Sequence, residues 1–178
     1  MEIFKLKFTL LQQEIARFLA INAGKSFNAL DLSKALKVSP TAIAKSLSQL
    51  EKEGLIKVKK DKRFSIEFNR DSPKALSFKR VENLRSIYDS GLFEFLFEEF
   101  PGATIILFGS YSRGDDTITS DIDIAIIGRK EKKVELDKFE KILERKIILQ
   151  FYASFKEIHK NLKENIFNGI LLKGGIEL

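Results

Sequence analysis

Two aspartates set one residue apart inside an apolar run are the side chains best suited to chemistry in this sequence. Asp121 and Asp123 belong to residues 121–127, DIDIAII, whose alternation of polar and apolar residues predicts a β-strand. Residues two apart on a strand point to the same face, so the two carboxylates would lie side by side. Such a pair repels unless a cation lies between the charges, and carboxylate oxygens suit Mg²⁺ or Mn²⁺. We therefore expect Asp121 and Asp123 to bind a divalent metal.

A Gly-Ser pair precedes the aspartates and suits a phosphate group. Gly109 and Ser110 follow residues 103–108, ATIILF, a continuous apolar run that predicts a buried strand. A glycine lets the backbone approach a phosphate closely, and a serine at a helix start adds a hydroxyl and N–H donors. Arg113 would supply positive charge. We predict that Gly109, Ser110 and Arg113 bind a phosphate-bearing ligand.

The combination of Gly-Ser, ten intervening residues and Asp-x-Asp resembles the signature of the DNA polymerase beta-type nucleotidyltransferase superfamily, and is most similar to its minimal nucleotidyltransferases. Gly109, Ser110, Gly114, Asp121 and Asp123 match that motif, and the resemblance covers about residues 80–178. It implies that the two aspartates are catalytic residues that hold the metal and that the Gly-Ser turn holds a triphosphate. An NMP would pass from an NTP, which we expect to be ATP, to an unknown acceptor with release of pyrophosphate.

The third acid that active members of this superfamily usually supply is missing. They carry it on a neighbouring strand, and the strand expected here, residues 146–153, is KIILQFYA. Ile148 takes the place of the acid, or Gln150 does if the register is shifted. Glu144 and Glu157 lie close by in sequence, although the surface of a helix is their more usual place. The sequence therefore leaves open an active transferase and a fold that binds nucleotide without efficient transfer.

The elements that must position these residues are predicted from periodicity. Helices within residues 74–100 lead into the sheet, with Val81, Leu84 and Tyr88 at helical spacing before Gly91. Another helix, at 134–145, separates the second and third strands, and a further one is expected at 154–166. Residues 71–178 thus predict a small nucleotidyltransferase α/β domain with a mixed sheet, in a chain of the α+β class.

Residues 1–70 predict a separate domain. Three helices are expected within residues 8–54, where Asn28 and Ser39 are candidate N-caps and Pro40 opens the third helix. Residues 55–68, LIKVKKDKRFSIEF, predict a β-hairpin with a charged turn. Three helices followed by a basic hairpin resemble a winged helix-turn-helix domain.

The charge of this first part favours a polyanion as its partner. Residues 1–74 carry 15 Lys and Arg against 8 Asp and Glu, whereas the remainder is near neutral. We expect the third helix to present residues to the major groove of DNA and the hairpin to contact phosphates. A protein-docking domain is the alternative to DNA binding. For the whole chain, the alternative to an active transferase is a winged-helix transcriptional regulator or antitoxin-like protein whose transferase fold is catalytically weak or inactive and binds only a nucleotide or a partner. The predicted DNA contacts are Thr41, Lys45, Ser46 and Gln49 on the helix and Lys59, Lys60, Lys62 and Arg63 on the hairpin.

Composition excludes several other classes of site. The sequence has no cysteine and one histidine, His159, so it contains neither disulfides nor a thiolate or His-rich metal site. Its N-terminus lacks the apolar core of a signal peptide and no run suggests a membrane span, so we expect a cytoplasmic location. The resemblance adds a small helical HEPN-type protein as a partner to consider, and a homodimer is a further option.

Overall fold

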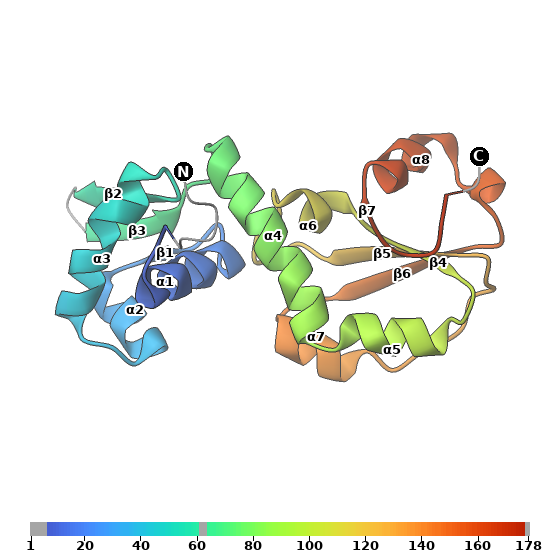
Figure 1. Cartoon of the computed structure of the whole chain (residues 1–178), viewed down its shortest axis with the longest axis horizontal. Helices are drawn as coiled ribbons and strands as arrows, with labels where there is room; N and C mark the ends of the chain where they lie inside the picture. Colours follow the sequence, from blue (N-terminus) through green and yellow to red (C-terminus); the bar gives the residue numbers. More distant parts are fainter. Residues whose placement is uncertain (1–6, 61–63, 177–178) are drawn as a thin grey trace. The chain divides into compact units, whose positions relative to one another are not determined.

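The computed structural model of the chain describes residues 7–60, without the side chain of Lys60, and residues 64–176 (Figure 1). The chain divides into two compact units between Lys79 and Arg80, inside a helix rather than at the expected boundary near residue 70. Each unit has its own apolar core.

In the described part of the first unit, the helices α1, α2 and α3 and the start of α4 accompany a small antiparallel sheet with strand order β1-β3-β2. Its second and third helices begin at the predicted caps. The Asn28 side chain accepts hydrogen bonds from the N–H groups of Leu30 and Asp31, and the Ser39 hydroxyl accepts one from Ala42. The elements are α1 (Leu10–Ile21), β1 (Ser26–Phe27), α2 (Ala29–Leu36), α3 (Pro40–Lys52), β2 (Ile56–Lys60) and β3 (Phe64–Phe68).

The core of the first unit comes from apolar side chains of its helices and of the hairpin. Ile15 and Leu19 of α1, Leu32 of α2 and Ile43 of α3 are buried together with Ile66 of β3. The helices and the hairpin thus form one folded body, in the order that the sequence predicts. The two-residue strand β1 was not predicted, because two residues are too few to show a period.

The second unit is built on a four-stranded mixed sheet with strand order β6-β5-β4-β7, in which only β5 and β6 run parallel to each other. This confirms the α+β class and the mixed sheet. Helix α4 (Pro73–Asp89) contains the division between the units. The other elements are α5 (Leu92–Glu99), β4 (Thr104–Phe108), α6 (Gly109–Arg113), β5 (Ile122–Ile127), α7 (Asp137–Leu143), β6 (Ile147–Tyr152), the 3₁₀ turn η1 (Phe155–Glu157), α8 (Lys160–Phe167) and β7 (Ile170–Lys173).

Helices cover both faces of this sheet, as Figure 1 shows for α5 and α7 on one side and α8 on the other. Leu92 and Phe139 pack on the first face against alternate residues of β4 and β5. Ile158 and Ile166 pack on the second face, against residues such as Ala125. Because both faces are covered, the loops at the strand ends are the places where the sheet can present polar groups.

Two expected helices differ from the structure. Residues 154–166 do not form one helix, because Ile158 is extended and His159 caps the start of α8, its Nδ1 accepting a hydrogen bond from Asn161. Helix α7 is also shorter than the predicted 134–145, beginning at Asp137 and ending where Glu144 adopts a left-handed conformation. His159 is exposed.

Among the described residues, the helices are all too short or too polar to cross a membrane.

Candidate functional site

The Gly-Ser turn and the Asp-x-Asp pair meet at one end of the sheet. Phe108, the last residue of β4, pairs with Asp123 of β5, so Gly109 begins α6 beside the Asp123 carboxylate. A Cβ atom built on Gly109 would lie 2.5 Å from Asp123 Oδ2, and Gly109 has a φ of +74°. Only glycine meets both conditions without strain. The structure therefore places the two halves of the motif next to each other.

The two aspartates form a carboxylate pair whose charge is incompletely compensated. Asp121 is exposed just before β5, and Asp123 is partly buried within it. Burial raises the pKa of the Asp123 carboxyl above its ordinary value, the charge of Asp121 raises it further, and the charge of Arg113 acts in the opposite direction. A raised pKa at a pair of hard oxygen ligands fits a divalent cation. Among the residues that the structure describes, no group of three or more acidic or histidine side chains is placed to hold a metal.

The remaining predicted ligand residues lie on α6. Ser110 is half-buried in its first turn, and Arg113 is exposed in its last turn, where its Nε donates a hydrogen bond to Asp115 Oδ2 at 3.2 Å. Since Arg113 also acts on the pKa of Asp123, its positive charge lies near the carboxylate pair. The structure thus brings Gly109, Arg113, Asp121 and Asp123 to the same end of the sheet.

Strand β6 presents an apolar side chain next to Asp123. The parallel pairing sets Ile148 beside Asp123 and Gln150 beside Ala125, which resolves the register in favour of Ile148. Paired residues of neighbouring strands point to the same face. Ile148 is 41% exposed, an unusual place for a large apolar side chain. Gln150 accepts a hydrogen bond from the Tyr152 hydroxyl at 2.8 Å and so belongs to another contact.

The two glutamates near the expected strand in sequence, Glu144 and Glu157, do not lie on β6. Glu144 is exposed at the end of α7. Glu157, in η1, accepts a hydrogen bond from the N–H of Ala153 at 3.1 Å, beyond the far end of β6. A third carboxylate beside Asp123 is therefore lacking among the described residues of this strand.

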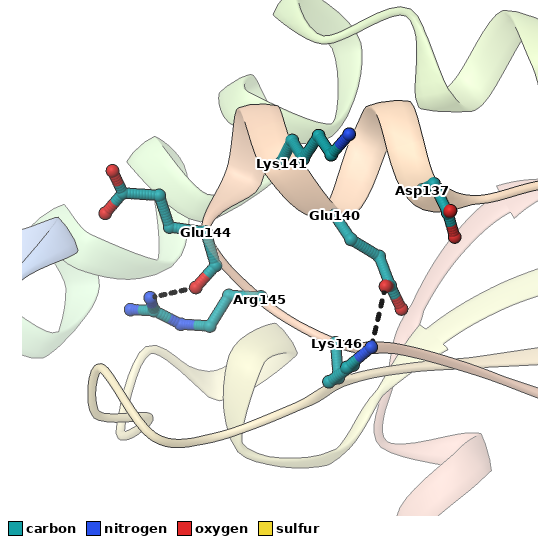
Figure 2. A pocket seen from close by; sticks show the side chains of 6 residues that line it. All are labelled: Asp137, Glu140, Lys141, Glu144, Arg145 and Lys146. Carbon is teal, nitrogen blue, oxygen red and sulfur yellow. Dashed lines mark hydrogen bonds and ion pairs between the residues drawn. The ribbon is translucent and has the colours of Figure 1, made fainter.

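A pocket of about 450 Å³ lies between α7 and the start of β6. In Figure 2, Glu140 turns toward Lys146, while the Glu144 side chain points away from that pair. Glu140 accepts hydrogen bonds from Lys146 Nζ at 3.1 Å and from the N–H of Ile147 at 3.0 Å, which lower its pKa. The pKa of Lys146 is raised chiefly by Glu140, with smaller contributions from Asp137 and Asp121. This acid therefore anchors the start of the strand that carries Ile148.

A buried polar network supports the loop between α6 and β5, and the sequence did not reveal it. The Asn83 amide donates hydrogen bonds to the Tyr111 carbonyl at 2.8 Å and to Asp116 Oδ1 at 2.7 Å. Arg145 Nη2 lies 3.9 Å from Asp116 Oδ2, and Arg145 Nη1 donates to the Glu144 carbonyl. Asn83, Asp116 and Arg145 are each at most 5% exposed. The network ties α4 to both α6 and the residues that precede β6.

The predicted DNA-contacting residues of α3 differ in their exposure. Thr41 and Lys45 are exposed, and Gln49 is half-buried with its Nε2 donating to Glu53 Oε1 at 3.4 Å. Ser46 is a correction: it is 8% exposed, and its hydroxyl donates to the Ala42 carbonyl one turn earlier, so it does not lie on the outward face.

The hairpin residues are only partly described. Lys59 is exposed and its Nζ lies 3.0 Å from Glu67 Oε2 on the neighbouring strand. The predicted contacts of Lys62 and Arg63 fall outside the described residues, as does the side chain of Lys60.

Comparison with known proteins agrees with this geometry. Residues 90–172 match a family model described as a nucleotidyltransferase domain. No curated protein and no solved structure gave a significant match to the chain. The matched residues include Gly109, Ser110, Asp121, Asp123 and the strand with Ile148. The second unit is therefore similar to nucleotidyltransferase domains, whose reaction in general is the transfer of an NMP group.

Proposed function

We propose that the second unit binds an NTP together with Mg²⁺ or Mn²⁺ and transfers its NMP group to an acceptor hydroxyl. The observation that carries this proposal is the contact of the Asp123 carboxylate with Gly109, since it unites a carboxylate pair with a turn suited to phosphate. Asp121 and Asp123 would hold the metal. Gly109, Ser110 and Arg113 would hold the triphosphate. ATP is the NTP we expect.

In the proposed reaction, the acceptor oxygen forms a bond to the α-phosphorus while the bond from that phosphorus to the bridging oxygen breaks, releasing pyrophosphate. The bound metal would neutralise phosphate charge and polarise the reacting phosphoryl group. Arg113 adds positive charge on the same side. Because Ile148 has no basic atom, the proton of the acceptor hydroxyl passes to water or phosphate rather than to β6.

Labelled NTPs test this proposal. The full chain is incubated with α-³²P-labelled NTPs and Mg²⁺ or Mn²⁺, alone and with cell extract, and compared with the D121N/D123N variant. We expect label on an acceptor with the wild-type chain and none with the variant. Absence of label that depends on the two aspartates, with every NTP and both metals, would overturn transfer as the function.

We further propose that the first unit is a winged helix-turn-helix domain that binds DNA. The support is the positive charge of residues 1–74 and the exposure of Thr41, Lys45 and Lys59. Lys45→Ala should weaken DNA binding and reduce the slope of log affinity against log salt by about 1, the effect of losing one phosphate contact. Lys141→Ala, an exposed lysine of the second unit, is the control. A salt slope near zero for the wild-type chain would contradict this proposal.

A second candidate function is a DNA-binding regulator in which the transferase fold only senses a nucleotide. The observation that favours it is Ile148 beside Asp123. Binding to two carboxylates and a triphosphate survives loss of the third acid more easily than turnover does. Nucleotide-dependent DNA affinity without any transfer would support this candidate. Transfer by the wild-type chain at an ordinary enzymatic rate would exclude it.

A further inference from the structure

A second pocket lies at the opposite end of the sheet from the aspartates. Strand β4 starts at Thr104, which pairs with Ile127 at the end of β5, whereas Phe108 pairs with Asp123. Phe108 is four residue steps along the strand from Thr104, a distance of about 13 Å. The pocket has a volume of about 770 Å³, within the usual range for small-molecule sites. It is therefore a cavity distinct from the proposed metal and triphosphate site.

Positive charge lines this pocket without acidic compensation in its wall. Among its described lining residues, the charged ones are Lys156 of η1 and Lys163 of α8. Ser154 and Thr104 add hydroxyl groups to the wall. Cations and hydroxyls without a carboxylate favour an anionic ligand, and phosphate most of all.

An aromatic pair lines the same pocket. The rings of Phe155 and Phe167 lie 5.7 Å apart at an interplanar angle of 56°, and Lys163 Nζ lies 5.6 Å from the Phe167 ring centroid. Aromatic side chains bind planar rings of any base by stacking. A ligand that carries both a planar ring and a phosphate would thus contact the phenylalanines with its ring and the lysines with its phosphate.

Glycines leave room for such a ligand next to the backbone. Gly128 and Gly175 line the pocket, and a Cβ atom built on either would meet no atom within 4 Å. The backbone of both loops therefore faces open space. Gly175 has no left-handed φ, so a large side chain can be introduced there without backbone strain.

We propose that this pocket binds a mononucleotide, with its phosphate on Lys156 and Lys163 and its base against Phe155 and Phe167. The site is separate from the proposed metal site and does not depend on Asp121 or Asp123. The second unit would thus bind a free nucleotide at one end of its sheet, whereas the proposed metal and triphosphate site lies at the other end.

The test uses the full chain carrying D121N/D123N, so that the proposed metal site is disabled, in buffer with EDTA. AMP, GMP, adenosine and inorganic phosphate are titrated by calorimetry. We expect AMP or GMP to bind at least about tenfold more tightly than adenosine or phosphate. Phosphate binding as tightly as the nucleotides, or no binding of any nucleotide, would overturn the proposal.

Two variants on the same background locate the binding. K156A/K163A should weaken nucleotide binding at least about tenfold because both cations are lost, and Gly175→Trp should abolish it by filling the open space. Lys160→Ala, an exposed lysine of α8 outside the pocket wall, is the matched control. Circular dichroism verifies that each variant is folded. If K156A/K163A and Gly175→Trp both bind nucleotide with unchanged affinity, the assignment to this pocket is contradicted. This result does not depend on whether Asp121 and Asp123 bind a metal-bound NTP.

Discussion

Strands β5 and β6 are parallel neighbours that present opposite chemistry at the same end of one sheet. Asp123 of β5 pairs with Ile148 of β6, so a carboxylate and an apolar side chain lie side by side. The residues before β5 are held by the buried pair of Asn83 and Asp116, whereas the start of β6 is held near the surface by Glu140. The pairing of β5 with β6 thus sets residue 148 beside Asp123, and in this chain that residue has no acidic group. Under the proposed function, nucleotide binding and nucleotidyl transfer would therefore be separable, and variants at position 148 test this.

The largest expected effect comes from giving β6 an acid beside Asp123 of β5. Ile148→Asp places a carboxylate beside Asp123, where it can accept the proton of an acceptor hydroxyl, and a general base contributes about 10²–10⁴-fold in rate. We expect the rate of NMP transfer to rise within that range, measured with labelled NTP. Ile148→Asn, which has nearly the same shape without the negative charge, is the control and should leave the rate near that of wild type. Equal rates for both variants would show that position 148 does not limit transfer.

The second-largest effect concerns the buried hydrogen bonds of Asn83, which hold the loop that precedes β5. Asn83→Ala removes two buried hydrogen bonds and leaves the Asp116 carboxylate with one donor fewer, so we expect a loss of about 2–4 kcal/mol in the free energy of unfolding. Urea unfolding followed by circular dichroism measures it. Ser86→Ala on the same helix removes only a hydrogen bond from its hydroxyl to the Glu82 carbonyl and should cost much less. Similar losses for the two variants would refute a special role for the network.

A smaller effect concerns the charge on β5 itself. The pKa of Asp123 is raised by burial and by Asp121, so the ionised carboxyl destabilises the fold at pH values above its folded pKa. Asp123→Asn should increase the free energy of unfolding at pH 7 without divalent metal, by less than about 1 kcal/mol because the group is partly exposed. Asp89→Asn, an exposed residue paired with Arg85 on α4, should not stabilise. Lower stability of Asp123→Asn would contradict the account of an incompletely compensated pair.

The smallest effect concerns the start of β6. Hydrogen bonds from Ile147 and Lys146 lower the pKa of Glu140 below its ordinary value of 4.5, so the stability it contributes is present above that value and lost as pH falls through the folded pKa. Glu140→Gln should cost about 0.5 kcal/mol or less at pH 7, and the difference from wild type should shrink at acid pH. Urea unfolding at both pH values measures this. A difference that is the same at both would contradict the assigned cause.

The sequence predicted the elements that carry regular apolar patterns. Alternating or continuous apolar runs located β4, β5 and β6, and side-chain caps located α2 and α3. The adjacency of Gly109 and Asp123 could be predicted because the motif lies at the junction of two strands. The pairing register of β6 could not be predicted. Register is set by an alternation of apolar and polar residues between the two faces of a strand, and this strand is apolar over most of its length.

Helix α4 shows why the supporting network was missed. Its predicted apolar face included Val81 and Tyr88, which are 64% and 41% exposed. The buried positions instead include Lys79 and Asn83, two polar residues that hydrophobic periodicity assigns to the surface. Lys79 donates to the Ala20 carbonyl at 2.6 Å and Asn83 binds Tyr111 and Asp116. Buried polar groups are recognised by their partners, which only the fold brings together.

The most direct test of the central claim is the binding of ATP with and without Mg²⁺. Calorimetry on the wild-type chain is compared with the D121N/D123N variant, each in Mg²⁺ and in EDTA. The account predicts a Mg²⁺-dependent component of ATP binding in the wild-type chain that disappears in the variant, while any metal-independent binding remains in both. ATP binding by the wild-type chain that is the same in Mg²⁺ and in EDTA, or Mg²⁺-dependent binding that survives in the variant, would contradict it.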